Sequence, residues 1–292
     1  MNEKTKNYGK SIRSKLLNVS KQEGIFYQTV LTRYFQERVL YRLSQTRYRD
    51  HFFLKGGALM YAHEKFAARP TLDIDFLGSG IKNDGGHIVS AFREICSVDC
   101  PEDGVVFDIE HITSENITEQ KDYHGIRLHI PVAMDTISQM LSMDIGFGDV
   151  ITPSPVLLDY PLLISTLPQA SIMAYSVETV IAEKMHAVID LGNQSSRMKD
   201  YYDLFHLLHE GKYDRETLTD AVVNTFRNRH TSYTEDAAFF ERKKIEEKFG
   251  CIRIICYFCA QFGTRYVNQY EVRHRQHRRI LRAKGSDLFY YV

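Results

Sequence analysis

The sequence lacks an excess of either charge, a long hydrophobic run and any tryptophan. Lys and Arg total 37, as do Asp and Glu, so the charge of the whole chain indicates neither a nucleic-acid binder nor a membrane-surface protein. No apolar segment approaches the roughly 18 to 20 residues that span a bilayer. The N-terminal residues also lack the continuous apolar segment of a secretory signal. These absences predict a cytosolic protein without a membrane partner.

Cysteine is scarce, and its pattern argues against a structural metal. The chain has 5 cysteines, an odd number, and only Cys256 and Cys259 have the CxxC spacing. A structural zinc site needs four ligands, and no second pair lies near this one. We therefore interpret these cysteines as small buried residues of a C-terminal helix.

Hydrophobic periodicity divides the chain into three predicted regions. Residues 1–50 have apolar side chains every three to four positions, with a break at Gly24, which predicts a helical buttress packed on the next region. Residues 51–160 mix short apolar runs with helical stretches, and residues 161–292 are mainly helical in composition. The proline-bearing stretch 153–168 marks the expected boundary between them.

The middle region predicts an α+β core. The expected elements, in order, are a strand at 51–54, a helix at 58–68, a strand at 72–77, a loop at 78–86, a helix at 88–96 and strands at 105–112, 126–133 and 140–147. This order is typical of a mixed sheet covered by helices.

Two carboxylates alternate with apolar residues in the stretch Leu72-Asp73-Ile74-Asp75-Phe76. Successive side chains of a strand point to opposite faces, so Asp73 and Asp75 share a face and lie about 7 Å apart. Carboxylate oxygens are the ligands that hard divalent cations prefer. A two-metal reaction also needs a third acid, for which we choose Asp144, with Asp108 and Glu110 as alternatives.

A glycine turn precedes this strand. Gly56 and Gly57 open a predicted helix, where backbone N–H groups without a neighbouring Cβ suit a triphosphate. Lys55, Arg69 and Lys184 supply positive charge for the phosphates, and Thr71 completes the predicted nucleotide-binding set. The order and spacing of glycine turn, helix and acidic strand favour phosphoryl or nucleotidyl transfer.

Two further charged residues are predicted on packed helix faces. On a helix from Val177 to Leu191, Lys184 lies in the middle of the apolar face, a costly position unless an anion pairs with it. On the next helix, which begins near Arg197, Asp200 also lies on the packed side. Asp200 is either a helix-dipole partner or part of a site shared with Lys184, and the pairing favours the site.

The basic C-terminal stretch RYVNQYEVRHRQHRRILRAKG mixes Arg and His with Tyr and Val. Such a composition suits contact with an RNA backbone and its bases, but a charged helix is more often a solvated surface. Both interpretations stay open.

The motifs LKGGALMYA, RPTLDIDFL, MDIGFGDVITP, ETVIAEKMHAV and SRMKDYYDLFHLL, in this order, resemble the AbiEii family of toxin nucleotidyltransferases. That family is related to the MenT toxins and to the polymerase β-like nucleotidyltransferase superfamily. The resemblance covers roughly residues 52–208. It implies a polymerase β-like core completed by a helical C-terminal domain.

The resemblance also implies site roles and partners. Gly56 and Gly57 would meet the triphosphate of an NTP, Asp73 and Asp75 would bind Mg²⁺ or Mn²⁺, and the further catalytic residues would be Asp144, Lys184 and Asp200. The implied acceptor is RNA, in related toxins the 3′ end of tRNA, and the implied partner is a cognate antitoxin. Two alternatives remain, namely transfer to a protein or small molecule, and nucleotide binding without catalysis.

Overall fold

The computed structural model describes residues 7–119, 123–191 and 198–231, in two compact units. The first unit holds residues 7–186 and 211–231, and the second holds residues 187–210, so the division falls inside a helix. The helices are α1 (Tyr8–Glu23), α2 (Tyr27–Ser44), α3 (Gly56–Glu64), α4 (Gly85–Cys96), α5 (Val177–Leu191), α6 (Met198–Glu210) and α7 (Arg215–Asn228). The strands are β1 (Phe52–Lys55), β2 (Asp73–Gly78), β3 (Val106–Phe107), β4 (Thr113–Glu119), β5 (Tyr123–Met134), β6 (Ile137–Phe147), β7 (Val156–Asp159) and β8 (Ser171–Ala174).

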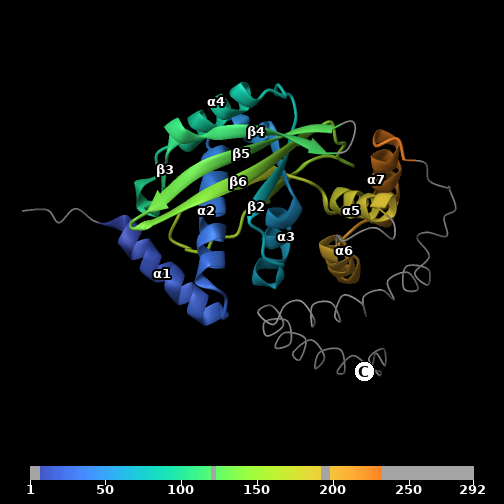
Figure 1. Cartoon of the computed structure of the whole chain (residues 1–292). Helices are drawn as coiled ribbons and strands as arrows, with labels where there is room; N and C mark the ends of the chain where they lie inside the picture. Colours follow the sequence, from blue (N-terminus) through green and yellow to red (C-terminus); the bar gives the residue numbers. More distant parts are fainter. Residues whose placement is uncertain (1–6, 120–122, 192–197, 232–292) are drawn as a thin grey trace, which may run out of the picture. The chain divides into compact units, whose positions relative to one another are not determined.

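A mixed sheet forms the centre of the first unit (Figure 1). Its strand order is β3-β5-β6-β2-β1-β8-β7, with β4 paired to β5. The pairs β2–β6 and β1–β8 are parallel, and the other pairs are antiparallel. The predicted α+β class with a mixed sheet is therefore confirmed.

One face of the sheet carries the hydrophobic core. Ile74 and Phe76 on β2 are buried, as are Met143 and Ile145 on the neighbouring β6. The ring of Phe76 lies 5.9 Å from that of Phe52 on β1, and the Phe52 ring lies 5.1 Å from that of Phe92 on α4. Alternation places the residues between these on the opposite face, which is only partly buried.

Helix α2 is buried along most of its length and passes behind the sheet (Figure 1). Three of its buried charged side chains form ion pairs inside the unit: Arg38 with Glu37 at 2.8 Å, and Arg42 with Asp103 at 2.7 Å. The sequence predicted a supporting helix at this place. Pairing allows these charged residues to be buried. The sequence of α2 is therefore more polar than is usual for a helix in the core.

Side-chain caps define several helix starts. The Asp84 carboxylate accepts a hydrogen bond from the backbone N–H of His87 at 2.8 Å, which starts α4. Ser176 caps α5 as predicted, accepting from the backbone N–H of Thr179 at 3.2 Å. Gly24 ends α1 in the left-handed conformation, at the predicted break.

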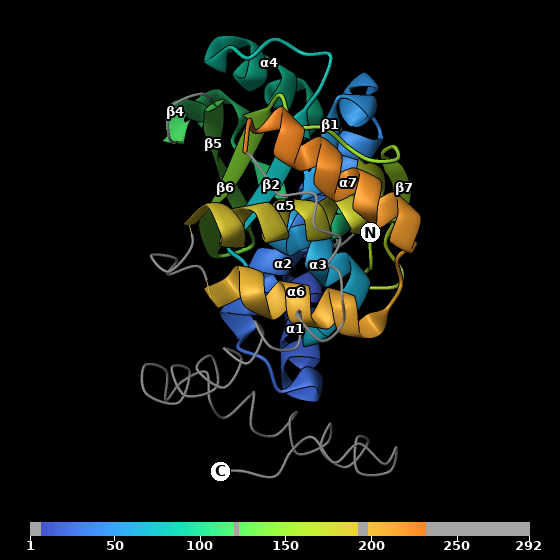
Figure 2. The same ribbon diagram turned by 90° about the vertical axis from the view of Figure 1, so that its right-hand side faces the viewer.

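Helix α7 returns to the first unit and lies beside the N-terminal part of α5, as the view in Figure 2 shows. The carboxylate of Glu178 on α5 accepts from the backbone N–H of Asp214, which caps α7. The ring of His186 on α5 lies 5.1 Å from that of Phe226 on α7. This helix lies within the region predicted to be mainly helical, although its bounds had not been predicted.

The structure corrects several predicted elements. The strand expected at 105–112 is only Val106–Phe107, followed by a 3-10 turn at Ile109–His111. Asp108 and Glu110, the alternative third carboxylates, therefore do not lie on a strand face. Strand β7 lies within the stretch expected to be irregular, and β4 and β8 were not expected at all. These strands are short or polar, so they have little apolar alternation to reveal them.

The second unit contains α6 and the C-terminal part of α5. On α6, Asp200, Leu204 and Leu207 are buried, which confirms the predicted packed face, and Asp203 is buried as well. The CxxC pair and the basic stretch at 265–285 lie outside the described residues. Among the helices of the described ranges, none is long and apolar enough to cross a membrane.

Candidate active site

A row of charged side chains crosses the open face of the sheet. Register places Lys55 of β1 opposite Asp75 of β2, Asp75 beside Asp144 of β6, and Asp144 opposite Arg127 of β5. Cross-strand neighbours point to the same face, so the two carboxylates are adjacent and are flanked by one cation on each side. Asp73 shares this face, two residues before Asp75.

The glycine turn lies directly against this row. Gly56 has a φ of 64°, which favours glycine, and a Cβ there would overlap the Asp75 carboxylate. A Cβ on Gly57 would lie 2.7 Å from the Thr71 hydroxyl oxygen. Both glycines therefore allow the start of α3 to approach Asp75 and Thr71 more closely than any other residue would.

Asp144 is held by an arginine that sequence reasoning missed. Arg127 donates from Nε and Nη2 to the two oxygens of Asp144, both at 2.7 Å. This bidentate arrangement fixes the plane of the carboxylate and raises the pKa of Arg127 above its usual value. No local feature of the sequence indicates this contact, because it depends on which strand pairs with β6.

The donor set fits a divalent ion that is shared with substrate. Among the described residues, no three His, Cys, Asp or Glu side chains are grouped so as to hold a metal by themselves. Mg²⁺ is usually held by one or two carboxylates together with substrate phosphates. Asp73 and Asp75 offer two such carboxylates next to a helix start that suits phosphate, so Mg²⁺ fits here with a triphosphate present.

Lys55 is already engaged by carboxylates. Its Nζ lies 2.8 Å from Asp149 Oδ2 and 3.5 Å from Glu183 Oε2. Arg229, at the end of α7, binds both of these carboxylates. Sequence reasoning missed Asp149, Glu183 and Arg229, although Asp149 is part of the MDIGFGDVITP motif. The role of Lys55 at the phosphates stays a prediction.

The other predicted residues are distributed over both units. Arg69 and Thr71 precede β2 and are half-buried, and the Thr71 hydroxyl donates to the Asp73 carbonyl at 3.2 Å. Lys184 is buried on α5 in the first unit, as its position on the apolar face predicted. Asp200 belongs to the second unit, so its pairing with Lys184 stays a prediction.

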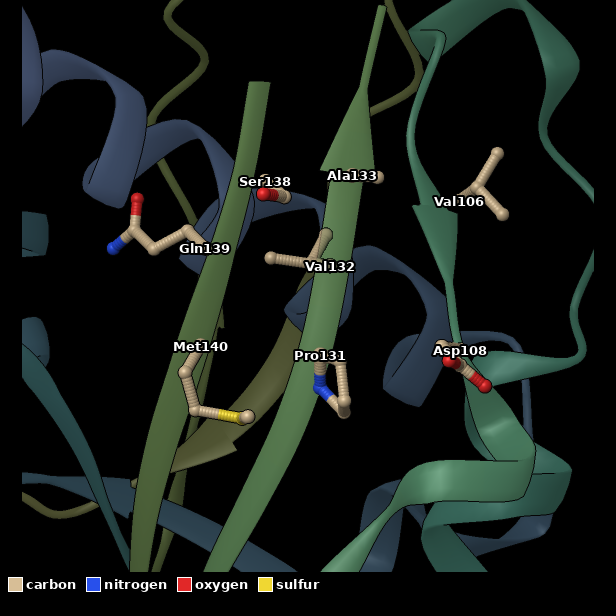
Figure 3. Close-up of a pocket in the computed structure, with 8 residues that line it drawn as sticks. All are labelled: Val106, Asp108, Pro131, Val132, Ala133, Ser138, Gln139 and Met140. Carbon is tan, nitrogen blue, oxygen red and sulfur yellow. The ribbon is translucent and has the colours of Figure 1, made fainter. Parts of the chain in front are cut away.

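A hollow of about 460 Å³ lies further along the same sheet face, on β3, β5 and β6 (Figure 3). Pro131 and Met140 are opposite each other there, four residues from the Arg127–Asp144 pair. Its exposed lining is largely apolar, and Asp108 is its one ionisable residue among those that the structure describes. The hollow therefore lacks the grouped charges of the row and is not the candidate active site.

The chain is similar to a known protein family. Residues 38–250, more than half of the chain, match the family described as nucleotidyl transferase AbiEii toxin, Type IV TA system. No curated protein matches the chain.

Several solved structures are similar in part. The crystal structure of JHP933 from Helicobacter pylori has 16% identity and a TM-score of 0.41, with 65% of this chain and 75% of that chain covered. An antigenic nucleotidyltransferase-like protein from Paracoccidioides brasiliensis has 13% identity and a TM-score of 0.38, with coverages of 66% and 88%. The antibiotic-resistance factor ANT(2'')-Ia has 14% identity and a TM-score of 0.38, with coverages of 69% and 94%. By its family match, the chain belongs to the nucleotidyl transferase AbiEii toxins of Type IV toxin–antitoxin systems.

Proposed function

We propose that this toxin is a metal-dependent enzyme that transfers a nucleotide from an NTP to the 3′ end of an RNA, with tRNA as the acceptor. The observation that carries the proposal is the placement of Asp73, Asp75 and Asp144 on one sheet face, against the glycine turn that opens α3. Membership of a toxin–antitoxin family implies a nucleotide substrate and an antitoxin partner.

In the proposed reaction, Asp73 and Asp75 hold Mg²⁺ or Mn²⁺, with Asp144 as the third acid. The metal, when bound, lowers the pKa of the acceptor hydroxyl and offsets charge on the phosphate. The backbone N–H groups of Gly56 and Gly57 meet the triphosphate at the start of α3. The side chains proposed to neutralise or bind the phosphates are Arg69, Thr71 and Lys184, whereas the ammonium of Lys55 is held by Asp149 and Glu183.

The bond changes in this reaction balance without a further reactant. The 3′-hydroxyl oxygen of the acceptor attacks the α-phosphorus, and a new P–O bond forms as the bond to the β-phosphate oxygen breaks. Pyrophosphate leaves, and the hydroxyl proton passes to the Asp144 carboxylate. Arg127 keeps that carboxylate oriented, and Asp200 is proposed to orient Lys184 or the base.

The direct test is incorporation of label from α-labelled NTPs into purified tRNA in the presence of Mg²⁺. Asp75→Asn removes a metal-binding charge worth several kcal/mol, so we expect activity to fall about 100-fold or more. Asp220→Asn, an exposed acid on α7, is the matched control and keeps full activity. Removal of Mg²⁺ with a chelator abolishes incorporation.

Other outcomes decide between the alternatives. Label that appears only in a protein fraction rejects RNA as the acceptor and supports transfer to a protein side chain. NTP binding with equal strength with and without Mg²⁺, and with no turnover, rejects catalysis. Growth arrest that persists in cells expressing Asp75→Asn separates toxicity from nucleotide transfer.

A further inference from the structure

Lys55, Asp149, Glu183 and Arg229 form a closed ring of four charges, which we call the charge ring. Lys55 Nζ contacts Asp149 Oδ2 at 2.8 Å and Glu183 Oε2 at 3.5 Å. Arg229 Nη2 donates to Asp149 Oδ1 and to Glu183 Oε1, both at 2.9 Å. Each carboxylate therefore binds both cations, and the formal charge of the ring is zero.

The charge ring joins four separate segments of the first unit. Lys55 ends β1, Asp149 follows β6, Glu183 lies on α5, and Arg229 follows α7. Tyr175 contacts the ring from outside, because its hydroxyl donates to Glu183 Oε1 at 3.3 Å. The side chains are largely buried, with exposures of 9% for Asp149 and 18% for Glu183.

Burial makes the ring sensitive to the removal of any member. Burial alone would lower the pKa of Lys55, but the charges of Glu183 and Asp149 raise it well above its ordinary value. Burial raises the pKa of Glu183, whereas Lys55 and Arg229 lower that of Asp149 against the effect of its burial. Removing one partner of a buried pair leaves an uncompensated charge, which costs far more than removing both partners.

Two members are adjacent in sequence to proposed substrate-binding residues. Lys55 directly precedes Gly56, and Glu183 directly precedes Lys184. The ring therefore ties the glycine turn to the helix that carries Lys184. Lysine has three donors, and two carboxylates already bind the ammonium of Lys55, which leaves little capacity for a phosphate.

We propose that the charge ring is a positioning device that fixes the glycine turn relative to α5, and that Lys55 and Arg229 act on the nucleotide through it. The inference rests on the proposed function, because it concerns how that site binds NTP. It replaces direct phosphate binding by Lys55 with an indirect role. It also gives Arg229, Asp149 and Glu183 roles as positioning residues.

The test uses the full chain and compares single variants with a charge-balanced double variant. Lys55→Met leaves two carboxylates against one cation, whereas Lys55→Met with Glu183→Gln leaves the neutral Arg229–Asp149 pair. Binding of α,β-methylene analogues of the four ribonucleoside triphosphates with Mg²⁺ is measured by calorimetry. Thermal unfolding of each variant shows that binding is measured on folded protein.

The proposal predicts that single substitutions in the charge ring weaken nucleotide binding and that the charge-balanced double variant restores it. Lys55→Met and Arg229→Gln each raise the Kd for the nucleotide about tenfold, and the double variant returns it to within about threefold of the wild-type value. The matched control is Arg227→Gln, at an exposed arginine in the last turn of α7, and it binds nucleotide as the wild type does. If Lys55 bound the phosphate directly, a second substitution would not restore binding.

Three results overturn the proposal. In the first, the double variant binds as weakly as Lys55→Met while Arg229→Gln binds normally, which makes Lys55 a phosphate ligand. In the second, every variant binds nucleotide normally and only its melting temperature falls, which makes the ring a support for stability alone. In the third, the wild-type chain binds no nucleotide at all, which rejects the proposed function and this inference together.

Discussion

At the scale of single residues, Gly56 is the position where the absence of a Cβ matters both for the backbone conformation and for the candidate active site. Its φ of 64° is unfavourable for residues with a Cβ, and that Cβ would overlap the Asp75 carboxylate. Gly24 has nearly the same φ of 65°, but nothing lies within 4 Å of a Cβ there. Substitutions at the two glycines therefore distinguish the cost of the left-handed backbone conformation from the cost of steric overlap with Asp75.

We expect Gly56→Ala to reduce nucleotide transfer about 100-fold or more, because the methyl group displaces Asp75 from the row of carboxylates. Gly24→Ala carries only the conformational cost, about 1 kcal/mol of unfolding free energy, and keeps its activity. Label incorporation and urea unfolding measure the two effects. Equal activity of both variants would show that Asp75 does not need its present position.

At the scale of secondary-structure elements, strand pairing assembles the candidate site. The row of charges exists only when β1, β2, β6 and β5 pair in register. The sequence was sufficient to predict the Asp73/Asp75 face, because strand alternation is a local property. It was not sufficient to predict the Arg127–Asp144 pair, which depends on which strand lies beside β6. Parallel pairing of β2 with β6 brings Asp144 to Asp75 across 69 residues of sequence.

The bidentate contact gives a prediction for Arg127→Lys. Lysine keeps the positive charge but is a point donor that does not reproduce the planar fork on Asp144. Removing such an outer partner of a metal-binding carboxylate typically costs about 10–100-fold in metal affinity or activity. We therefore expect the Mg²⁺ concentration for half-maximal activity to rise about tenfold.

Arg47→Lys is the matched control, because Arg47 forms an exposed pair with Glu94 at 2.9 Å outside the row. Its Mg²⁺ titration should coincide with that of the wild type. An unchanged Mg²⁺ requirement in Arg127→Lys would mean that Asp144 needs no orienting contact, or that it takes no part in metal binding.

Helix α2 shows why part of the fold was less visible in the sequence. Its helical nature follows from its periodicity, but its depth in the core does not, because Glu37, Arg38 and Arg42 are charged and buried. Burial raises the pKa of Glu37 to about 7, against the opposing charge of Arg38. An acid that is buried in this way binds its proton more tightly in the folded than in the unfolded chain.

This shift predicts how stability changes with pH. Between pH 4.5 and 7 the folded chain retains a proton that the unfolded chain releases, so the free energy of unfolding falls as pH rises through this window. At about 1.4 kcal/mol per pH unit, the contribution of Glu37 falls by about 3 kcal/mol in total. Glu37→Gln lacks this dependence, and Glu23→Gln, an exposed residue of α1, retains it. Urea unfolding across this range measures the difference, and parallel curves for wild type and Glu37→Gln would contradict the prediction.

At the scale of the whole molecule, balanced charge means that any contact with RNA must be local. The chain has 37 basic and 37 acidic residues, yet the stretch at 265–285 contains arginines in close succession. That stretch lies outside the described residues, and its role in RNA binding stays a prediction from composition. Phosphate contacts have a measurable signature, because each one adds to the salt dependence of binding.

Replacing Arg273, Arg275, Arg278 and Arg279 with Gln tests this role. If these side chains bind the acceptor backbone, affinity for tRNA falls, and the slope of log affinity against log salt becomes shallower by about 0.7 to 0.9 for each phosphate that the variant no longer neutralises. Affinity for NTP with Mg²⁺ is unchanged, because the proposed nucleotide residues are intact. The control replaces Lys10, Lys15 and Lys21, exposed on α1, with Gln, and we expect it to leave both affinities unchanged. An unaltered salt slope in the arginine variant would show that the basic stretch is a solvated surface, so that the acceptor is held elsewhere.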